Sequence, residues 1–154
     1  SLFWFELPFE VSVPPHCASC SESAPSTPHY RLLVAEDNPI VARVLKLQLE
    51  ELGHQVTNVA DGLQAFELAS HERFDAVIMD CQMPHMDGFE ATRRLRELYT
   101  PQELPIIALT ANARIVENYS TFSKAGMNDY LIKPALSQDL QRLLLRWVDS
   151  SAAA

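Results

Sequence analysis

The sequence lacks a long apolar run, an excess of basic residues and enough cysteine for a disulfide framework. No run approaches the roughly 20 apolar residues that a membrane-spanning helix needs, so we expect no membrane contact by this chain. The 154 residues carry a net charge of −8, which argues against nucleic-acid binding because that activity needs a basic face. An odd count of three cysteines does not suggest a secreted disulfide scaffold.

The first residues also lack a basic segment followed by a small-residue cleavage site, so they are not a secretory signal peptide. We therefore expect a cytoplasmic location. Cys17 and Cys20 have the Cys-x-x-Cys spacing that metal and redox sites use. No second ligand pair follows them and no strand-to-helix context surrounds them, so we expect no functional role for this pair.

What the chain does contain is a change of pattern near residue 30. Residues 1–13 alternate aromatic and polar side chains, which predicts one strand. Residues 14–29 hold prolines, serines and few large apolar groups, which predicts a linker. Short apolar runs then alternate with amphipathic stretches over residues 30–149, and residues 150–154 form a tail. The pattern predicts one folded domain over residues 30–149.

Five apolar runs within this domain predict strands, each followed by a predicted helix. The strands are expected over residues 32–35, 55–59, 76–79, 106–109 and 129–132. The helices are expected to begin at Asn38–Pro39, Asp61 and Gly88 (ending at Leu98), with a weakly patterned fourth over 113–125 and a last one carrying Leu140, Leu143, Leu144 and Trp147. Apolar residues at helical spacing predict the core-facing stripe of the first helix: Val41, Val44, Leu45, Leu49 and Leu52. A five-fold βα alternation with right-handed crossovers predicts an α/β fold, a doubly wound five-stranded parallel sheet.

Polar residues follow four of the five predicted strands. Glu36 and Asp37 follow the first strand, Asp80 the third, Thr110 the fourth and Lys133 the fifth. Because ligands bind at the carboxyl ends of the strands in an open doubly wound sheet, we expect these side chains to converge on one rim. Three carboxylates in one place repel each other unless a cation or a proton joins them. Oxygen ligands without histidine or cysteine favour Mg²⁺ as that cation.

These residue types together predict phosphoryl chemistry. A carboxylate can act as a nucleophile and form an aspartyl phosphate. A lysine and a hydroxyl beside a metal can hold the oxygens of an incoming phosphoryl group. The residues alone therefore point to an aspartate-based, Mg²⁺-dependent phosphoryl acceptor, with Asp80, Lys133 and Thr110 in the catalytic roles.

The run from Asp80 to Gly88, Asp-Cys-Gln-Met-Pro-His-Met-Asp-Gly, resembles the signature of response-regulator receiver domains, Asp-x-x-Met-Pro-x-Met-Asp-Gly. Glu36-Asp37-Asn38 resembles the acidic pair of that family, and Thr110-Ala111 its hydroxyl followed by a small residue. Lys133-Pro134 resembles its lysine before a proline, a bond that is usually cis in the family. The resemblance covers residues 30–149 with every motif in order. It implies a CheY-like, flavodoxin-like (βα)5 fold with strand order 2-1-3-4-5.

The resemblance also assigns roles around the metal. It implies that Asp80 is the phosphoacceptor and that Asp37 ligates Mg²⁺ most directly. Glu36, Asp80 and the backbone carbonyl of Gln82 complete the implied metal site. Glu36 stands where many members have aspartate, and its longer side chain can still act on the metal through water. Lys133 is implied to pair with Asp80 and then with the phosphoryl group.

Four residues receive further roles from the resemblance. Thr110 binds a phosphoryl oxygen, and Tyr130 turns inward as Thr110 moves, so the two form a switch. The side chains of Gln82 and Asn112 occupy the positions that set the lifetime of the phosphate in the family.

Residues 1–10 carry a second resemblance. Ser-Leu-Phe-Trp-Phe-Glu-Leu-Pro-Phe is similar to the last strand of the ATP-binding domain of sensory histidine kinases, Gly-Ser-x-Phe-x-Phe-x-Leu-Pro. It implies that residues 1–13 are a remnant of that domain and that the chain is a fragment of a hybrid sensor histidine kinase anchored in the inner membrane. The phosphodonor is then the kinase core of the same parent, and the acceptor is a histidine phosphotransfer protein.

Two other functions compete with this interpretation. An Asp-nucleophile phosphatase also uses Mg²⁺ and a lysine, but such enzymes usually have a second aspartate two residues after the nucleophile, where this chain has Gln82. A binding module that no longer accepts phosphate is disfavoured by the intact acidic pair, Asp80, Thr110 and Lys133. Turnover of a small phosphoester would separate an enzyme from an acceptor that at most dephosphorylates itself.

Overall fold

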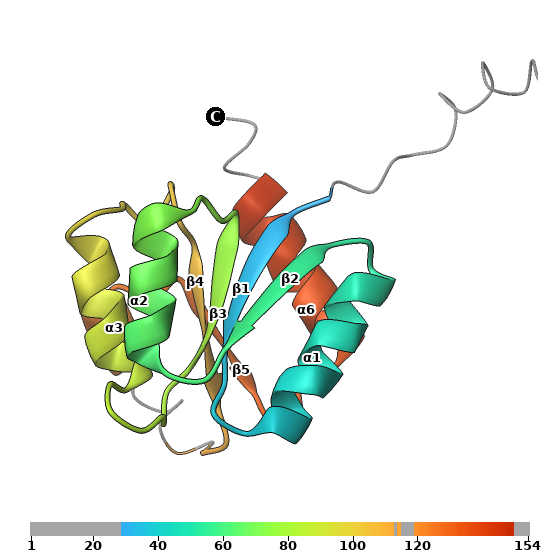
Figure 1. Cartoon of the computed structure of the whole chain (residues 1–154), viewed down its shortest axis with the longest axis horizontal. Coiled ribbons are helices and arrows are strands. Elements are labelled where there is room, and N and C mark those ends of the chain that lie inside the picture. The colour runs from blue at the N-terminus through green and yellow to red at the C-terminus, as the bar shows by residue number, and fades with distance from the viewer. Residues whose placement is uncertain (1–28, 113, 115–118, 150–154) are drawn as a thin grey trace, which may run out of the picture.

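The computed structural model describes residues 29–112, 114 and 119–149 (Figure 1). The predictions for residues 1–13, for 14–28 and for 150–154 therefore fall outside the described residues. Five strands form one parallel sheet in the order β2-β1-β3-β4-β5, which confirms the predicted fold class and strand order. The strands are β1 (Arg31–Ala35), β2 (Gln55–Val59), β3 (Ala76–Asp80), β4 (Ile106–Thr110) and β5 (Asp129–Ile132).

Short polar side chains start three of the helices. Asn38 Oδ1 accepts hydrogen bonds from the backbone N–H groups of Ile40 and Val41 at the start of α1. Asp61 and Asp87 cap α2 and α3 in the same way. Each cap satisfies N–H groups that have no partner within the helix. The helices are α1 (Pro39–Glu51), α2 (Gly62–His71), α3 (Gly88–Arg96), α5 (Tyr119–Ala125) and α6 (Ser137–Leu144), followed by the π-helical turn η2 (Leu145–Asp149).

The helices cover both faces of the sheet and bury a separate apolar cluster on each face (Figure 1). Leu45 and Leu49 of α1 pack with Leu140 and Leu144 of α6 on one face. Residues from α2, α3 and α5 pack on the other face, among them Phe122 of α5. All five residues of β3 and of β4 are buried, as a strand covered on both faces requires. Burying a side chain of this size contributes roughly 1.5–3 kcal/mol, so the two clusters fix the strands that carry the polar rim.

Two predicted helix ends differ from the structure, and the start of a third helix lies outside the described residues. The third helix ends at Arg96 rather than Leu98, because Glu97 and Leu98 donate to residues three positions back and tighten the last turn. Of the helix predicted over residues 113–125, the structure describes α5 from Tyr119 onward, whereas residues 113 and 115–118 lie outside the described residues. Trp147 belongs to the π-helical turn rather than to α6.

Val44 was predicted to face the core, and this prediction was wrong. Its side chain is 47% exposed, whereas Leu45 and Leu49 are buried. Ile40 and Leu47 are exposed as well, at 73% and 51%. Helix α1 has more apolar residues than one face can bury. The stripe that includes Ala42, Leu45 and Leu49 packs against the sheet. A second apolar stripe therefore faces away from the sheet.

The strand register brings the predicted polar residues to the same edge of the sheet. Ala35, the last residue of β1, pairs with Met79, and Asp80 pairs with Leu109. Thr110 pairs with Ile132, the last residue of β5. Asp80 and Thr110 are thus the final residues of their strands rather than the first loop residues, and the sheet itself fixes their backbones. No helix among the described residues has the length and apolar character needed to cross a membrane.

Candidate functional site

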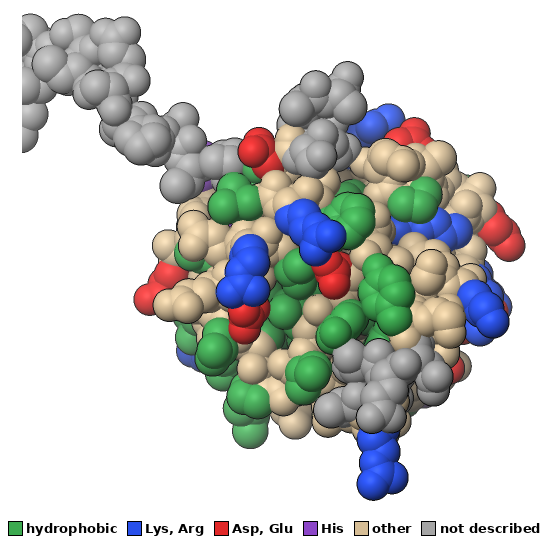
Figure 2. Space-filling view, turned by 180° about the vertical axis from the view of Figure 1, so that it is seen from behind, with side chains coloured by type: hydrophobic (Ala, Val, Ile, Leu, Met, Phe, Trp, Pro, Cys, Tyr) green, Lys and Arg blue, Asp and Glu red, His purple; other side chains and the backbone are tan. Residues whose placement is uncertain are grey.

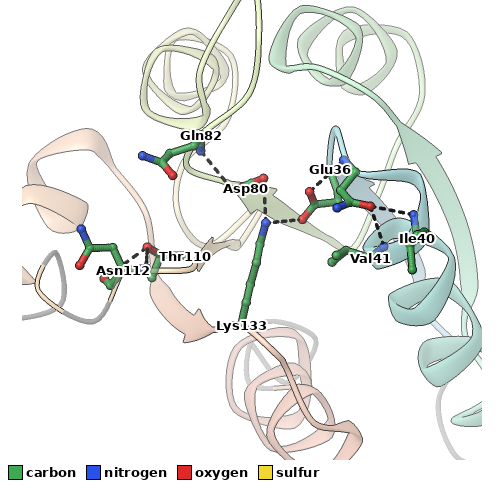
Figure 3. Close-up of polar contacts among 9 residues, drawn as sticks. Glu36, Ile40, Val41, Asp80, Gln82, Thr110, Asn112 and Lys133 are labelled. Carbon is green, nitrogen blue, oxygen red and sulfur yellow. Dashed lines mark hydrogen bonds and ion pairs between the residues drawn. The ribbon is translucent and has the colours of Figure 1, made fainter.

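Asp80, Glu36 and Lys133 meet at the carboxyl ends of β3, β1 and β5 (Figure 3). The ammonium of Lys133 lies 3.0 Å from Oδ2 of Asp80 and 2.7 Å from Oε2 of Glu36. Both carboxylates are buried, with exposures of 3% and 2%. Lys133 therefore spans two buried carboxylates that lie far apart in the sequence, as the sequence predicts.

Glu36 is held in place by contacts on both of its carboxylate oxygens. Oε1 accepts a hydrogen bond from the backbone N–H of Asn38, and Oε2 forms the ion pair with Lys133. Burial raises the pKa of Glu36 to about 7, helped by the charge of Asp80 and opposed by Lys133 and by the Asn38 N–H. This carboxyl group therefore changes protonation state near neutral pH.

Lys133 remains a cation although it is partly buried. Burial acts to lower its pKa, but the hydrogen bonds and charges of Glu36 and Asp80 outweigh burial and raise the pKa overall. Its backbone N–H donates to the carbonyl of Thr110, which anchors the residue to the end of β4. The peptide bond between Lys133 and Pro134 is cis. The backbone of Lys133 is thus held in place, and its ammonium is charged.

The three carboxylates form a group suited to a hard cation. Oxygens of Glu36, Asp37 and Asp80 lie within 4.8 Å of one another. Glu36 and Asp80 are buried, whereas Asp37 is exposed and leaves the group open to solvent. Lys133 supplies one positive charge against three carboxylates, so these four residues keep a negative excess even when Glu36 is protonated. An all-oxygen set with an open side fits Mg²⁺, which keeps several waters when it binds.

The neighbouring cysteine does not compete with this chemistry. Burial, together with the charges of Asp80 and Asp87, raises the pKa of the Cys81 thiol to about 12. The thiol therefore stays protonated at neutral pH and is a poor nucleophile.

Gln82, Thr110 and Asn112 flank Asp80 on the side away from Glu36 (Figure 3). The backbone N–H of Gln82 donates to Oδ1 of Asp80 at 3.1 Å, which fixes one carboxylate oxygen. The hydroxyl of Thr110 accepts a hydrogen bond from the backbone N–H of Asn112 at 3.1 Å. The side chains of Gln82 and Asn112 are exposed at the mouth of the site. The structure thus brings together all of the site residues predicted around Asp80.

Tyr130 lies on β5, three residues before Lys133, and packs against α5. Its ring stacks on Phe122 with the centroids 5.6 Å apart and meets Tyr119 edge-on at 6.2 Å. Phe122 also contacts Phe89 of α3 at 5.8 Å. The predicted switch residue therefore belongs to an aromatic cluster that joins α3, α5 and β5.

Sequence reasoning missed an apolar groove beside the site. Exposed residues of α1 line it together with the end of β2 and the start of α2, and its volume is about 920 Å³. Glu36 and Asp37 belong to the same lining, so the groove opens onto the carboxylate group. The sequence did contain a signal for this groove. Helix α1 has two apolar stripes, and the core buries only one of them. The stripe that lines the groove consists of Ile40, Val44 and Leu47.

Comparison with curated proteins finds relatives among sensor kinases. Sensor protein EvgS of Escherichia coli K12 is 40% identical over 134 residues, which cover 86% of this chain and 11% of EvgS. The chain spans 7% to 15% of the length of EvgS and three other curated relatives that it matches. The similarity is therefore to one part of much longer proteins.

Comparison with solved structures finds chains with the same fold. The receiver domain of sensor histidine kinase PA1611 from Pseudomonas aeruginosa PAO1, crystallised with a magnesium ion in its active-site cleft, is 45% identical. Its TM-score is 0.71, with 79% of this chain and 99% of that chain covered. A chain of the co-crystal structure of the Saccharomyces cerevisiae phosphotransfer protein Ypd1 with the receiver domain of Ssk1 shares the fold. It has 24% identity and a TM-score of 0.74, covering 82% of this chain and 93% of that chain.

A family model described as the response regulator receiver domain matches residues 32–145, most of the chain. This range contains Glu36, Asp37 and Asp80. It also contains all five strands, apart from Arg31, the first residue of β1. On the match over this range, this chain belongs to the family of response regulator receiver domains.

Proposed function

We propose that Asp80 accepts a phosphoryl group from a phosphohistidine in a two-component phosphorelay. The observation that carries the proposal is the position of Asp80, a buried carboxylate held by the Gln82 N–H and the Lys133 ammonium beside two further carboxylates. In the transfer, an oxygen of Asp80 forms a bond to phosphorus while the bond from phosphorus to the imidazole nitrogen breaks. The electron pair of that bond returns to the histidine.

Residues of this chain also fit a Mg²⁺ ion. We assign its ligands to Asp37, Asp80 and the backbone carbonyl of Gln82, with Glu36 acting nearby or through water. When bound, Mg²⁺ supplies positive charge to the phosphoryl oxygens. The donor set of Glu36, Asp37 and Asp80 supports this assignment, and so does the magnesium in the cleft of the similar PA1611 domain.

Lys133 and Thr110 complete the site in this proposal. Lys133 releases Asp80 as the carboxylate is phosphorylated and pairs with a phosphoryl oxygen instead, because the transferred group now carries the negative charge. The Thr110 hydroxyl, at the end of the neighbouring strand, donates to another phosphoryl oxygen. The exposed side chains of Gln82 and Asn112 control the approach of water and thereby the lifetime of the phosphate.

The groove over α1 is the surface that we assign to the histidine-bearing partner. Its apolar residues Ile40, Val44 and Leu47 are exposed, and it opens onto Glu36 and Asp37. A partner helix in this groove would bring a histidine to Asp80. Both the kinase core and the histidine phosphotransfer protein must present a histidine there, so we expect them to use the same groove in turn.

A second surface is assigned to switching. Thr110 and Tyr130 link the phosphate to α5, β5 and α6, where exposed apolar residues include Tyr119, Ile132 and Leu136. Figure 2 shows the side of the molecule that faces away from the viewer in Figure 1, where hydrophobic side chains lie among basic and acidic ones. A change in the position of Tyr130 would alter this surface, because its ring packs on Phe122 and Tyr119 of α5.

The alternative of an Asp-nucleophile phosphatase is not favoured. The family model and the relatives are receivers and sensor kinases. Gln82 offers an amide where such a phosphatase usually places its acid. We therefore expect no turnover of small phosphoesters beyond hydrolysis of the domain's own aspartyl phosphate.

The test is labelling with acetyl phosphate in the presence of Mg²⁺. Asp80→Asn should abolish labelling and keep the far-ultraviolet circular dichroism spectrum of the wild type. Asp87→Asn is the matched control, because Asp87 lies in the same loop and asparagine caps α3 equally well. EDTA should stop labelling, and Asp37→Ala should weaken Mg²⁺ binding severely. Undiminished labelling of Asp80→Asn would reject the assignment.

The parent of this domain is proposed to be a hybrid sensor histidine kinase. The sensor-kinase relatives support this origin, as does the resemblance of residues 1–10 to a kinase strand. Residues 1–13 would then contribute nothing to phosphate acceptance, since the described sheet has its five strands without them. A chain beginning at Pro28 should keep the Mg²⁺ affinity and the labelling rate of the full chain. Loss of labelling in that chain would assign residues 1–27 to the receiver instead.

A further inference from the structure

The loop that follows Asp80 contains an unfavourable turn. The N–H of Met86 donates to the carbonyl of Pro84 at 2.7 Å, and His85 between them has a φ of 67°. This is a γ-turn with positive φ, a rare conformation that costs energy for a residue other than glycine. Such a turn persists where contacts around it over-determine the backbone. The loop therefore needs an external support.

The N-terminus of α2 supplies contacts to this turn. The N–H of Gly62 donates to the carbonyl of Met86 at 3.2 Å. Asp61, which caps α2 through the N–H of Gln64, also places Oδ2 3.5 Å from Nδ1 of His85. The side chain of Met86 is buried in the core cluster. Helix α2 thus contacts the backbone and the side chain of the turn, although it carries none of the residues assigned to phosphate chemistry.

The contact is too close for any residue except glycine at position 62. A Cβ there would lie 2.5 Å from the carbonyl oxygen of Met86 and 3.1 Å from that of Asp87. Gly88 makes a similar close approach at the far end of the loop, where a Cβ would lie 2.2 Å from the Asp80 carbonyl oxygen. The loop is therefore fixed at both ends by backbone packed against backbone.

Gln82 lies between these two fixed points. Its N–H holds Oδ1 of Asp80, and its carbonyl is the metal ligand assigned above. We propose that Asp61 and Gly62 are positioning residues for the phosphoacceptor loop, which hold the backbone of residues 82–86 in the shape that metal binding requires. The inference rests on the proposed function for its consequence, but its structural part, the support of the loop by α2, stands apart from phosphorylation.

The first experiment measures labelling by acetyl phosphate over a range of Mg²⁺ concentrations in the full chain. Gly62→Ala pushes the Met86 carbonyl away, so the half-saturating Mg²⁺ concentration should rise roughly tenfold, as for residues that orient metal ligands elsewhere. The labelling rate at saturating Mg²⁺ should stay within about twofold of the wild type. Mere loss of folded protein would lower the rate at saturation and leave the half-saturating concentration unchanged.

The matched control is Gly126→Ala. Gly126 has a φ of 97°, and a Cβ there would lie 2.6 Å from Cγ of Arg96, so this substitution is also strained. Gly126 precedes β5, at the end of the sheet opposite to the carboxylate group. Gly126→Ala should lower the melting temperature without changing the half-saturating Mg²⁺ concentration. An equal rise in both variants would attribute the effect to general destabilisation and overturn the proposal.

A second pair of variants guards against misfolding of Gly62→Ala. Asp61→Ala removes the cap and the His85 contact, whereas Asp61→Asn keeps an oxygen for the cap and places an amide nitrogen within reach of Nδ1 of His85. Asp61→Ala should raise the half-saturating concentration severalfold, and Asp61→Asn should restore it. Amide hydrogen exchange at Gln82, Met86 and Gly88, measured without metal, should accelerate in Asp61→Ala alone of these two.

The exchange measurement also separates the two levels of inference. If the wild type takes no phosphate, the proposed function fails, while faster loop exchange in Asp61→Ala still supports the positioning role. If exchange and Mg²⁺ dependence both match the wild type in Gly62→Ala and Asp61→Ala, the positioning role is rejected whatever the phosphate result.

Discussion

The Lys133 ammonium lies 2.7 Å from Oε2 of Glu36, a carboxylate with 2% exposure. Despite this close cation, burial raises the pKa of Glu36 to about 7. Burial therefore outweighs the ion pair, and a proton competes with any metal ion that uses this carboxylate. If the proposed Mg²⁺ site forms, the protonation of Glu36 would link metal binding to pH.

The first prediction is that Mg²⁺ affinity rises with pH through neutrality. With a pKa of about 7, Glu36 is ionised in roughly a tenth of molecules at pH 6 and in most at pH 8. Affinity should therefore increase roughly tenfold between these pH values, measured by titration calorimetry. Glu36→Gln should flatten this dependence, whatever its absolute affinity. A wild-type affinity that does not change from pH 6 to 8 would contradict the role of Glu36.

The second prediction concerns the pH dependence of stability, first without metal and then with Mg²⁺. The pKa of Glu36 is raised from its ordinary value of 4.5 to about 7, so the folded state holds this proton more tightly than the unfolded state. The resulting stabilisation is complete below about pH 4.5 and is lost as pH rises through 7. Mg²⁺ should consequently raise the melting temperature more at pH 8 than at pH 6. Differential scanning fluorimetry measures this increase in melting temperature. An equal increase at pH 6 and pH 8 would contradict the predicted direction of the pH dependence.

The third prediction separates metal binding from phosphoryl transfer at Lys133. Lys133→Met removes the cation that pairs with Asp80 and Glu36, so Mg²⁺ affinity should not fall. Labelling by acetyl phosphate should fall roughly a hundredfold, because a charged donor to the developing phosphoryl charge is lost. Lys124→Met, on an exposed position of α5, is the control and should label normally. A variant at position 133 that labels at the wild-type rate would place the phosphoryl group elsewhere.

The fourth prediction concerns Arg96, whose side chain joins α3 to the loops at the opposite end of the sheet. Its guanidinium donates to the carbonyls of Gly126 and Leu104 and to Oδ1 of Asn128, all within 2.9 Å. Burial lowers the pKa of Arg96 to about 10, and the group is still charged at neutral pH. Arg96→Met should cost about 2–4 kcal/mol of unfolding free energy, because buried acceptors lose a charged donor.

The control for Arg96 is Arg93→Met on the exposed side of α3. Arg93 pairs with Glu90 in solvent, so its loss should cost less than about 1 kcal/mol in urea unfolding. Neither substitution should change the half-saturating Mg²⁺ concentration, since both residues lie outside the carboxylate group. A similar small cost for both variants would show that the buried hydrogen bonds of Arg96 add little.

The fifth prediction tests the switch. Beryllofluoride, which stands in for the phosphoryl group on Asp80, should shift the amide resonances of Asn112, of residues 119–125 and of Tyr130. The physical reason is that Thr110 would turn toward the bound group, while the ring of Tyr130 packs on Phe122 and would change its contacts with α5. Shifts confined to residues around Asp80 would favour a simple phosphate relay without a switch.

The parts that sequence reasoning predicted are those set by local pattern. The β5 strand over residues 129–132 and the convergence of Asp80 with Lys133 follow from apolar periodicity and from the rule for strand ends. The close approach of Gly62 to Met86 depends on how α2 settles on a loop far along the chain, which no local pattern encodes. Arg96 is similar, because its acceptors are backbone carbonyls that any residue supplies. The sequence of α1 shows two apolar stripes, but it does not show which of the two packs against the sheet.

The ion pair between Asp80 and Lys133 joins residues 53 positions apart, with the described elements α3, β4, α5 and β5 between them. During synthesis on the ribosome, Asp80 emerges well before the lysine that completes its site. The nascent chain is therefore unable to bring Asp80 and Lys133 together until β5 has paired with β4 at the edge of the sheet. Under the proposed function, uptake of phosphate would therefore require that the last strand of the sheet is already in place.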